Sequence, residues 1–113
     1  MVDDPHTVGS RRVVAGPERP EGAALEAVDQ VRRALPVAAL IVEPLMQGSA
    51  GIRFCRPSFL KRLVEMAQDA GVIVIFDEVA TGFGRTGTLF ALEQAGVVPD
   101  IVCLSKGLTG GYM

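Results

Sequence analysis

The stretch that decides the fold is VIVIFDEVATGFGRTG, residues 72–87. Five apolar residues lead into two adjacent acids, Asp77 and Glu78, and then into a loop that holds three glycines and one arginine. An apolar run of this length before a Gly-rich loop is typical of a buried strand. The acids at its end allow three interpretations: a magnesium–nucleotide site, an organic cofactor that needs a carboxylate, or a strand that simply surfaces in a turn.

Apolar runs of strand length alternate with amphipathic segments along the chain. Strands are expected over 37–44, 72–76 and 100–107, and helices over 21–35, 59–70 and 89–95. Pro36 and Gly71 are expected to end the first two helices, and Ser58 and Thr88 to cap the last two. Such an alternation predicts an α/β domain with a parallel sheet covered on both faces. Residues 1–20 show no period and are predicted to be an irregular segment before a domain over 21–113.

The carboxyl ends of these strands carry charged residues. Right-handed crossovers make all three strands parallel, so Glu43, Asp77 and Lys106 arrive at one edge, where ligands of open α/β sheets bind. Neighbouring strand ends lie roughly 5 Å apart, or about 10 Å across one strand, so a pyridine ring fits between Asp77 and Lys106. A lysine amine can form a Schiff base with an aldehyde, and a carboxylate beneath a ring nitrogen keeps that nitrogen protonated. This pairing favours pyridoxal 5'-phosphate.

Composition excludes several other classes. The chain has 113 residues, is 49% hydrophobic and carries a net charge of −2, as one small globular domain would. Its basic residues form no cluster larger than a pair, which argues against nucleic acid. No apolar run approaches the roughly 20 residues of a membrane helix, and acids at positions 3 and 4 argue against a secretory signal. A single His6 and two separated cysteines predict no metal site and a reduced, cytoplasmic protein.

The magnesium–nucleotide interpretation lacks its partner motif. It requires a loop of the form G-x-x-x-x-G-K-[ST] before the acidic strand, and the chain has none. The plain-turn interpretation stays open for each residue alone, because Asp77 could cap the turn and Lys106 could be a solvated lysine.

Three motifs resemble the core of class III, fold-type-I pyridoxal-phosphate aminotransferases: IVEPLMQGSAGI at 41–52, VIVIFDEVATGFGRTG at 72–87 and PDIVCLSKGLTGG at 99–111. The resemblance covers roughly residues 37–113. It implies that the chain is a parallel-strand portion of that family's large domain, which has three α/β/α layers. It also implies a small-molecule amino donor, a keto acceptor and a homodimeric parent.

The resemblance assigns roles by position. It implies that Lys106 is the Schiff-base lysine and the proton shuttle, that Asp77 is the partner of the pyridine nitrogen, and that Val79 packs against the ring. Glu43 is expected near the cofactor in a supporting ion pair with Arg85. Glu78 is expected to form an ion pair beside the site, without contact to the cofactor.

Two positions suggest a branch of the family. Ala80 stands where many members carry a glutamine, and Ser49 where the ornithine and GABA branch usually carries a glutamate. Ala80 within DEVATGFGRTG resembles the branch that forms 7,8-diaminopelargonate in biotin synthesis, and Ser49 disfavours the ornithine and GABA branch. Omega-amino acid–pyruvate transaminases share GFGRTG and remain an alternative.

Members of this family run to several hundred residues, so the chain resembles an internal fragment. The phosphate-binding turn, the ring-stacking aromatic residue and the substrate-binding arginine are expected outside it. The sheet should then have open edges and half-covered faces. The isolated chain is expected to lack transaminase activity, and a catalytically silent truncated domain is the rival interpretation.

Overall fold

The computed structural model describes residues 21–112, so the predicted irregular segment over 1–20 lies outside the described residues. In chain order the elements are α1 (Glu21–Ala34), β1 (Ala39–Val42), β2 (Met46–Gln47), the 3₁₀-helix η1 (Gly48–Ala50), β3 (Arg53–Phe54), α2 (Pro57–Asp69), β4 (Ile73–Asp77), α3 (Leu92–Ala95), β5 (Ile101–Cys103) and α4 (Lys106–Thr109). The alternation of strands and helices is the α/β pattern that the sequence predicts.

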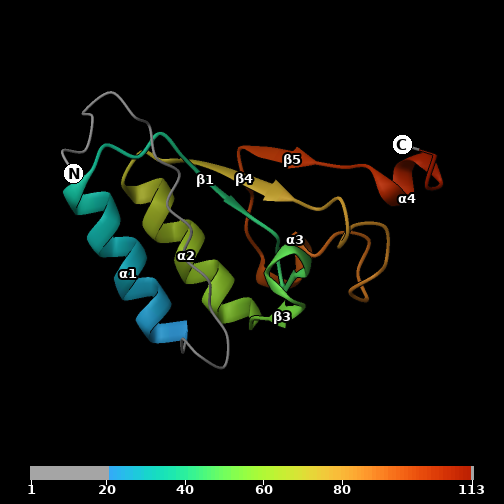
Figure 1. Ribbon diagram of the computed structural model, residues 1–113, viewed down its shortest axis with the longest axis horizontal. Coiled ribbons are helices and arrows are strands. Elements are labelled where there is room, and N and C mark those ends of the chain that lie inside the picture. The colour runs from blue at the N-terminus through green and yellow to red at the C-terminus, as the bar shows by residue number, and fades with distance from the viewer. Residues whose placement is uncertain (1–20, 113) are drawn as a thin grey trace, which may run out of the picture.

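The three longer strands form one sheet in the order β1-β4-β5, and both pairings are parallel. The decisive stretch therefore supplies the central strand, and its arrowhead points to the same end of the molecule as its neighbours' (Figure 1). The register sets Val42 beside Phe76, and Phe76 beside Val102. The predicted parallel sheet is confirmed. The short strands β2 and β3 make a separate antiparallel hairpin.

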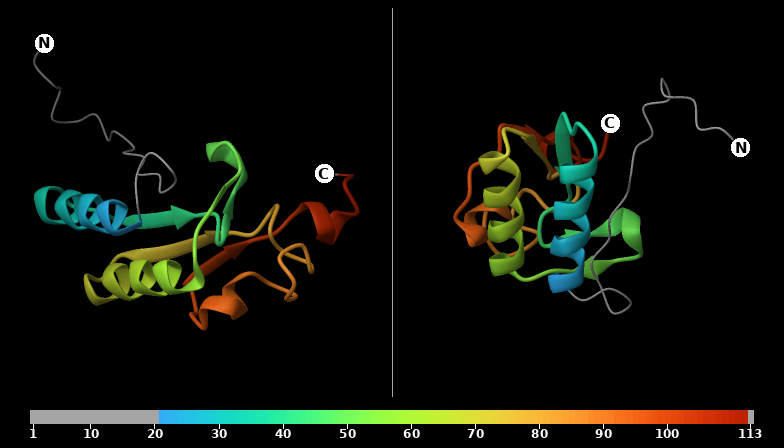
Figure 2. Two further views of the ribbon diagram at one scale, coloured as in Figure 1. Left: turned by 90° about the horizontal axis from the view of Figure 1, so that it is seen from below. Right: turned by 90° about the vertical axis from the view of Figure 1, so that its left-hand side faces the viewer.

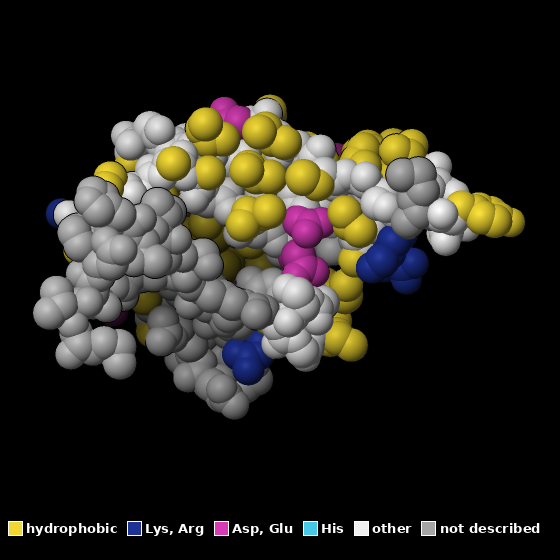
Figure 3. All heavy atoms as spheres, turned by 45° about the horizontal axis from the view of Figure 1, so that its top comes forward, with side chains coloured by type: hydrophobic (Ala, Val, Ile, Leu, Met, Phe, Trp, Pro, Cys, Tyr) yellow, Lys and Arg dark blue, Asp and Glu magenta, His cyan; other side chains and the backbone are white. Residues whose placement is uncertain are grey.

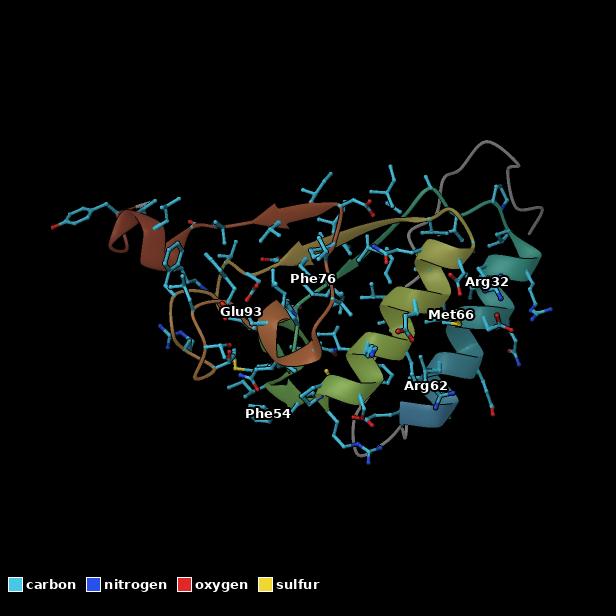
Figure 4. The ribbon with its side chains drawn as sticks, turned by 180° about the vertical axis from the view of Figure 1, so that it is seen from behind. Arg32, Phe54, Arg62, Met66, Phe76 and Glu93 are labelled. Atoms are coloured by element: carbon cyan, nitrogen blue, oxygen red, sulfur yellow. The ribbon has the colours of Figure 1, made fainter. Side chains whose placement is uncertain are left out.

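One face of the sheet carries the core. Helices α1 and α2 lie side by side beneath it (Figure 2), and α2 also packs against α3. Val74 and Phe76 are completely buried against Leu60 and Val64 of α2. Figure 4 shows Phe76 pointing from β4 toward the helices. Burying one such side chain is worth about 1.5–3 kcal/mol, so this interface holds the elements together.

The opposite face is open among the described residues. Because side chains alternate along a strand, Ile41, Ile73 and Ile101 all point away from the helices, and 65%, 48% and 48% of their surfaces are exposed. Apolar side chains gather there over the sheet (Figure 3). The prediction of helices on both faces is thus met on one face only within 21–112. The expected half-covered sheet is confirmed.

Several predicted boundaries move when tertiary contacts are present. Pro57 takes the first position of α2 and Arg56 precedes it as the cap, so Ser58 is not the cap. The hydroxyl of Thr88 donates to the carbonyl of Phe90 at 2.7 Å, and Ala91 precedes α3, so Thr88 does not cap that helix either. Local side-chain bonds of this kind compete with capping, and the sequence does not show which one forms.

Candidate active site

Asp77 ends the central strand on the open face. It lies beside Cys103 of β5 in the register and is half-buried. Its Oδ1 accepts a hydrogen bond from the backbone N–H of Val79 at 3.1 Å, which closes the turn after β4. Its Oδ2 receives no hydrogen bond among residues 21–112. Asp77 therefore does cap the turn, as its plain interpretation expects, and it keeps one acceptor oxygen for another partner.

Lys106 follows the neighbouring strand. β5 ends at Cys103, and three residues later Lys106 opens α4, so it begins a helix instead of ending a strand as predicted. Its side chain is exposed and forms no ion pair with any described residue. The backbone N–H of Glu78 donates to the carbonyl of Cys103 at 3.0 Å and ties the two strand ends together. The structure thus delivers Asp77 and Lys106 from hydrogen-bonded neighbours at the same edge.

A loop over residues 79–91 connects the end of β4 to α3, and it begins with Val79. Val79 is half-buried directly after the two acids. The N–H of Gly82 donates to the carbonyl of Glu78 at 3.0 Å, and a Cβ added at Gly82 would lie 2.9 Å from that same oxygen. Only glycine fits this close approach without a shift. The first glycine of GFGRTG is therefore a steric requirement of the turn.

Glu78 is completely buried, although it is the neighbour of half-buried Asp77. Its carboxylate accepts hydrogen bonds from the N–H of Ala91 at 2.6 Å, the hydroxyl of Thr81 at 3.1 Å and the N–H of Leu92 at 3.4 Å. The expected ion pair is replaced by hydrogen bonds to main-chain and hydroxyl donors, which satisfy a buried carboxylate equally well. Glu78 thus holds the far end of the loop against the end of β4.

Glu43 is likewise occupied locally. Its Oε2 accepts from the N–H of Gly48 at 2.8 Å, and its Oε1 accepts from the N–H of Ser49 at 3.1 Å and from the Ser49 hydroxyl. Arg85 is exposed in the 79–91 loop. No ion pair joins Glu43 to Arg85 within 21–112, so the expected pair is corrected: Glu43 fastens the β2–β3 hairpin to the end of β1.

One contact was not anticipated from the sequence. Phe83 has φ 60°, in the left-handed region, and its ring meets Phe90 edge to face with centroids 5.4 Å apart. A Cβ added at Gly107 would lie 2.7 Å from both Cβ and Cδ2 of Phe83. The loop therefore touches the residue next to Lys106. Two features of the sequence could have suggested this contact. Phe83 stands between two glycines, and a glycine directly follows Lys106.

Other kinds of site find no support over residues 21–112. No group of three potential metal ligands is present there, and no helix there has the length and apolar character needed to cross a membrane. The groove between α1 and α2 is lined by charged residues of both signs, including Arg32 and Arg62 (Figure 4). The residues that line this groove belong to the two helices or directly follow α2, and none of them lies at the strand ends beside Asp77.

Curated proteins that are similar in sequence to this chain are named as aminotransferases. An adenosylmethionine-8-amino-7-oxononanoate aminotransferase of Synechococcus elongatus is 55% identical over 96 residues, 85% of this chain and 23% of its own length. One from Mycobacterium leprae is 52% identical over 68% of this chain and 18% of its own. The chain therefore spans about a fifth of the length of these curated relatives.

Solved structures show the same likeness. A transaminase from Virgibacillus matches 85% of this chain and 22% of its own with a TM-score of 0.75 and 34% identity. The ornithine delta-aminotransferase of Plasmodium falciparum matches 78% of this chain and 23% of its own with a TM-score of 0.71 and 39% identity. The profile of the class III aminotransferases matches residues 10–113. The chain therefore belongs to the class III aminotransferase family.

Proposed function

We propose that this chain carries the cofactor-binding edge of an enzyme that transfers amino groups with the help of pyridoxal 5'-phosphate. The observation that carries the proposal is the delivery of Asp77 and Lys106 by two adjacent parallel strands whose ends are joined by the hydrogen bond from Glu78 to Cys103. The residues fit such a group. Asp77 has an unused acceptor oxygen, and Lys106 presents an amine that no described carboxylate neutralises.

Pyridoxal phosphate, when bound, supplies an electron-withdrawing ring that stabilises negative charge at the substrate's α-carbon. Asp77 would accept the hydrogen of the ring nitrogen and favour its protonated form. Lys106 would hold the cofactor covalently through its amine and move a proton at the α-carbon. Val79 would pack against the ring. Glu43 and Glu78 would support the site by fixing the hairpin and the loop, and Arg85 would remain at its exposed rim.

The proposed reaction of the whole protein is transfer of an amino group from a small-molecule donor to a keto acceptor in the biotin pathway, forming 7,8-diaminopelargonate. Support comes from the names of the curated relatives and from Ser49 and Ala80. An omega-amino acid–pyruvate transaminase is the alternative, because the GFGRTG motif at 82–87 also resembles that group of enzymes. Steady-state assays of the full-length parent with each acceptor separate the two. We propose a homodimer in the cytoplasm for that parent.

The lysine assignment can be tested on the chain itself. Lys61 and Lys106 are its only lysines, and exposed Lys61 on α2 is an internal control. After incubation with pyridoxal phosphate and reduction with borohydride, mass spectrometry should find the label preferentially on Lys106. Asp77→Asn should lower the Lys106 label and leave the Lys61 label unchanged. Equal labelling of the two lysines in the wild type would refute the assignment.

A catalytically silent domain is the second candidate. We expect the 113-residue chain to show no transamination even when it is labelled at Lys106, because one edge of a sheet supplies no complete substrate pocket. Measurable turnover by the purified chain would overturn this expectation. Absence of selective labelling at Lys106 would instead favour the silent domain.

A further inference from the structure

We propose that Phe83 is a positioning residue for Lys106, and that it acts through its contact with Gly107. The inference rests on the proposed role of Lys106. Phe83 lies in the loop that follows Asp77, and Gly107 directly follows Lys106. The contact therefore connects the two halves of the candidate site at a second place, outside their paired strands.

The fit between the two residues is close. Any side chain at Gly107 would begin 2.7 Å from the Cβ and Cδ2 of Phe83, well inside van der Waals contact. Gly107 itself lies in helix α4 outside the left-handed region, so its backbone does not require glycine. Space for the Phe83 ring is thus the structural reason for a glycine at this position.

The backbone conformation of Phe83 is strained. Its φ of 60° belongs to the left-handed region, where a residue with a Cβ is strained by about 1–3 kcal/mol. The edge-to-face contact with Phe90 offsets part of that cost. Such strain persists only where the surroundings fix the residue. Here the left-handed conformation of Phe83 places its ring against Gly107 of α4.

The loop that carries Phe83 is braced at several points. The N–H of Gly84 donates to the carbonyl of Leu89 at 3.1 Å, and the side-chain amide of Gln94 donates to the carbonyl of Thr86 at 2.7 Å. At its far end the buried carboxylate of Glu78 accepts from the N–H of Ala91. Glu78 is also the residue after Asp77. These hydrogen bonds fix the loop relative to the end of β4, and so they also fix the position of Phe83.

Helix α4, by contrast, is short, and its apolar side chain Leu108 is largely exposed. Four residues are too few for a helix that is stable by itself. Its Leu108 is 62% exposed and the following Tyr112 is 93% exposed. Packing of Phe83 against Gly107 therefore supplies a tertiary restraint at the point where Lys106 enters the helix.

Hydrogen exchange of the cofactor-free chain tests the restraint. The amides of Leu108, Thr109 and Gly111 are hydrogen-bonded within this segment. Phe83→Ala should speed their exchange about fivefold, the size expected for loss of one aromatic contact, and leave the amides of α2 unchanged. Leu89→Ala removes an exposed apolar side chain from the same loop and is the matched control. A uniform rise across the chain, or no rise in α4, would overturn the proposal.

The consequence for Lys106 is tested by the borohydride label. Phe83→Ala should lower the Lys106:Lys61 label ratio, and Phe83→Leu should restore most of it. Gly107→Ala should also lower the ratio in the wild type, but not further in a Phe83→Gly background, where both the Cβ and the ring that the new side chain would meet are gone. If the wild type labels Lys106 selectively and Phe83→Ala labels it equally well, the positioning role fails while the proposed function stands. If the wild type shows no selectivity, the proposed function fails first.

Discussion

The two faces of the β1-β4-β5 sheet have different roles. The face toward the helices contains Val74 and Phe76, both fully buried, and the open face contains Ile41 and Asp77. Successive residues of one strand therefore serve different purposes. The difference teaches that stability in this chain comes from the covered face, whereas the candidate chemistry lies on the face that contributes least to stability.

The largest test of this comparison is Phe76→Ala. Removing a fully buried aromatic side chain leaves a cavity beneath the sheet, and we expect it to lower the free energy of unfolding by about 3–5 kcal/mol. Denaturant unfolding followed by circular dichroism measures the change. A loss below about 1 kcal/mol would mean that the covered face is not the stabilising one.

Glu78→Ala should have the next largest effect. It leaves the buried N–H of Ala91 and the part-buried N–H of Leu92 without their acceptor, at a cost of about 1–3 kcal/mol. Glu78→Gln retains one acceptor oxygen and should lose less. Comparison of the two variants in the same unfolding assay separates the hydrogen bonds from the volume of the side chain. Equal losses would show that packing alone accounts for the role of Glu78.

Ile41→Ala is the counterpart of Phe76→Ala on the open face. Ile41 is 65% exposed, so its truncation should change the free energy of unfolding by about 0.5 kcal/mol or less. The same denaturant series provides the measurement. A loss comparable to that of Phe76→Ala would break the comparison and reveal that the open face is covered in solution.

The smallest expected effect concerns the ion pair between Glu21 of α1 and Arg56, which precedes α2. Burial pushes the pKa of Glu21 upward, but hydrogen bonds and the charge of Arg56 outweigh it and hold the pKa below the usual 4.5. The pair therefore stabilises the fold above about pH 4.5, and the gain disappears as pH falls through the lowered pKa. Thermal midpoints of Glu21→Gln and wild type should differ near pH 7 and converge at acid pH, below the lowered pKa of Glu21. A constant difference would contradict this.

Much of the fold follows from sequence patterns because each strand is apolar and each helix has a clear face. The helix predicted over 21–35 is α1, the strand predicted over 72–76 is β4 within one residue, and Gly71 does end α2 with φ 70°. These elements depend on local periodicity and on stop residues, which act over a few positions.

The side-chain partners could not be derived in the same way. Asp77 and Glu78 are adjacent acids of similar character, yet one is half-buried and the other wholly buried. Which acid turns inward depends on where the amides of residues 91 and 92 arrive, after a loop of more than ten residues. The contact between Phe83 and Gly107 depends on both that loop and β5, so no local pattern predicts it.

The strand order also has a consequence for synthesis. Ala39 of β1 pairs with Ile73, so the central strand is made 34 residues after its first partner. At a synthesis rate of about 5–20 residues per second, β1 waits roughly 2–7 s for a strand to pair with. Helix α2 is made during that interval, and Leu40 and Val42 pack against its Phe59 and Leu63. The helix that later supports the sheet thus becomes available to cover the unpaired strand before β4 is made.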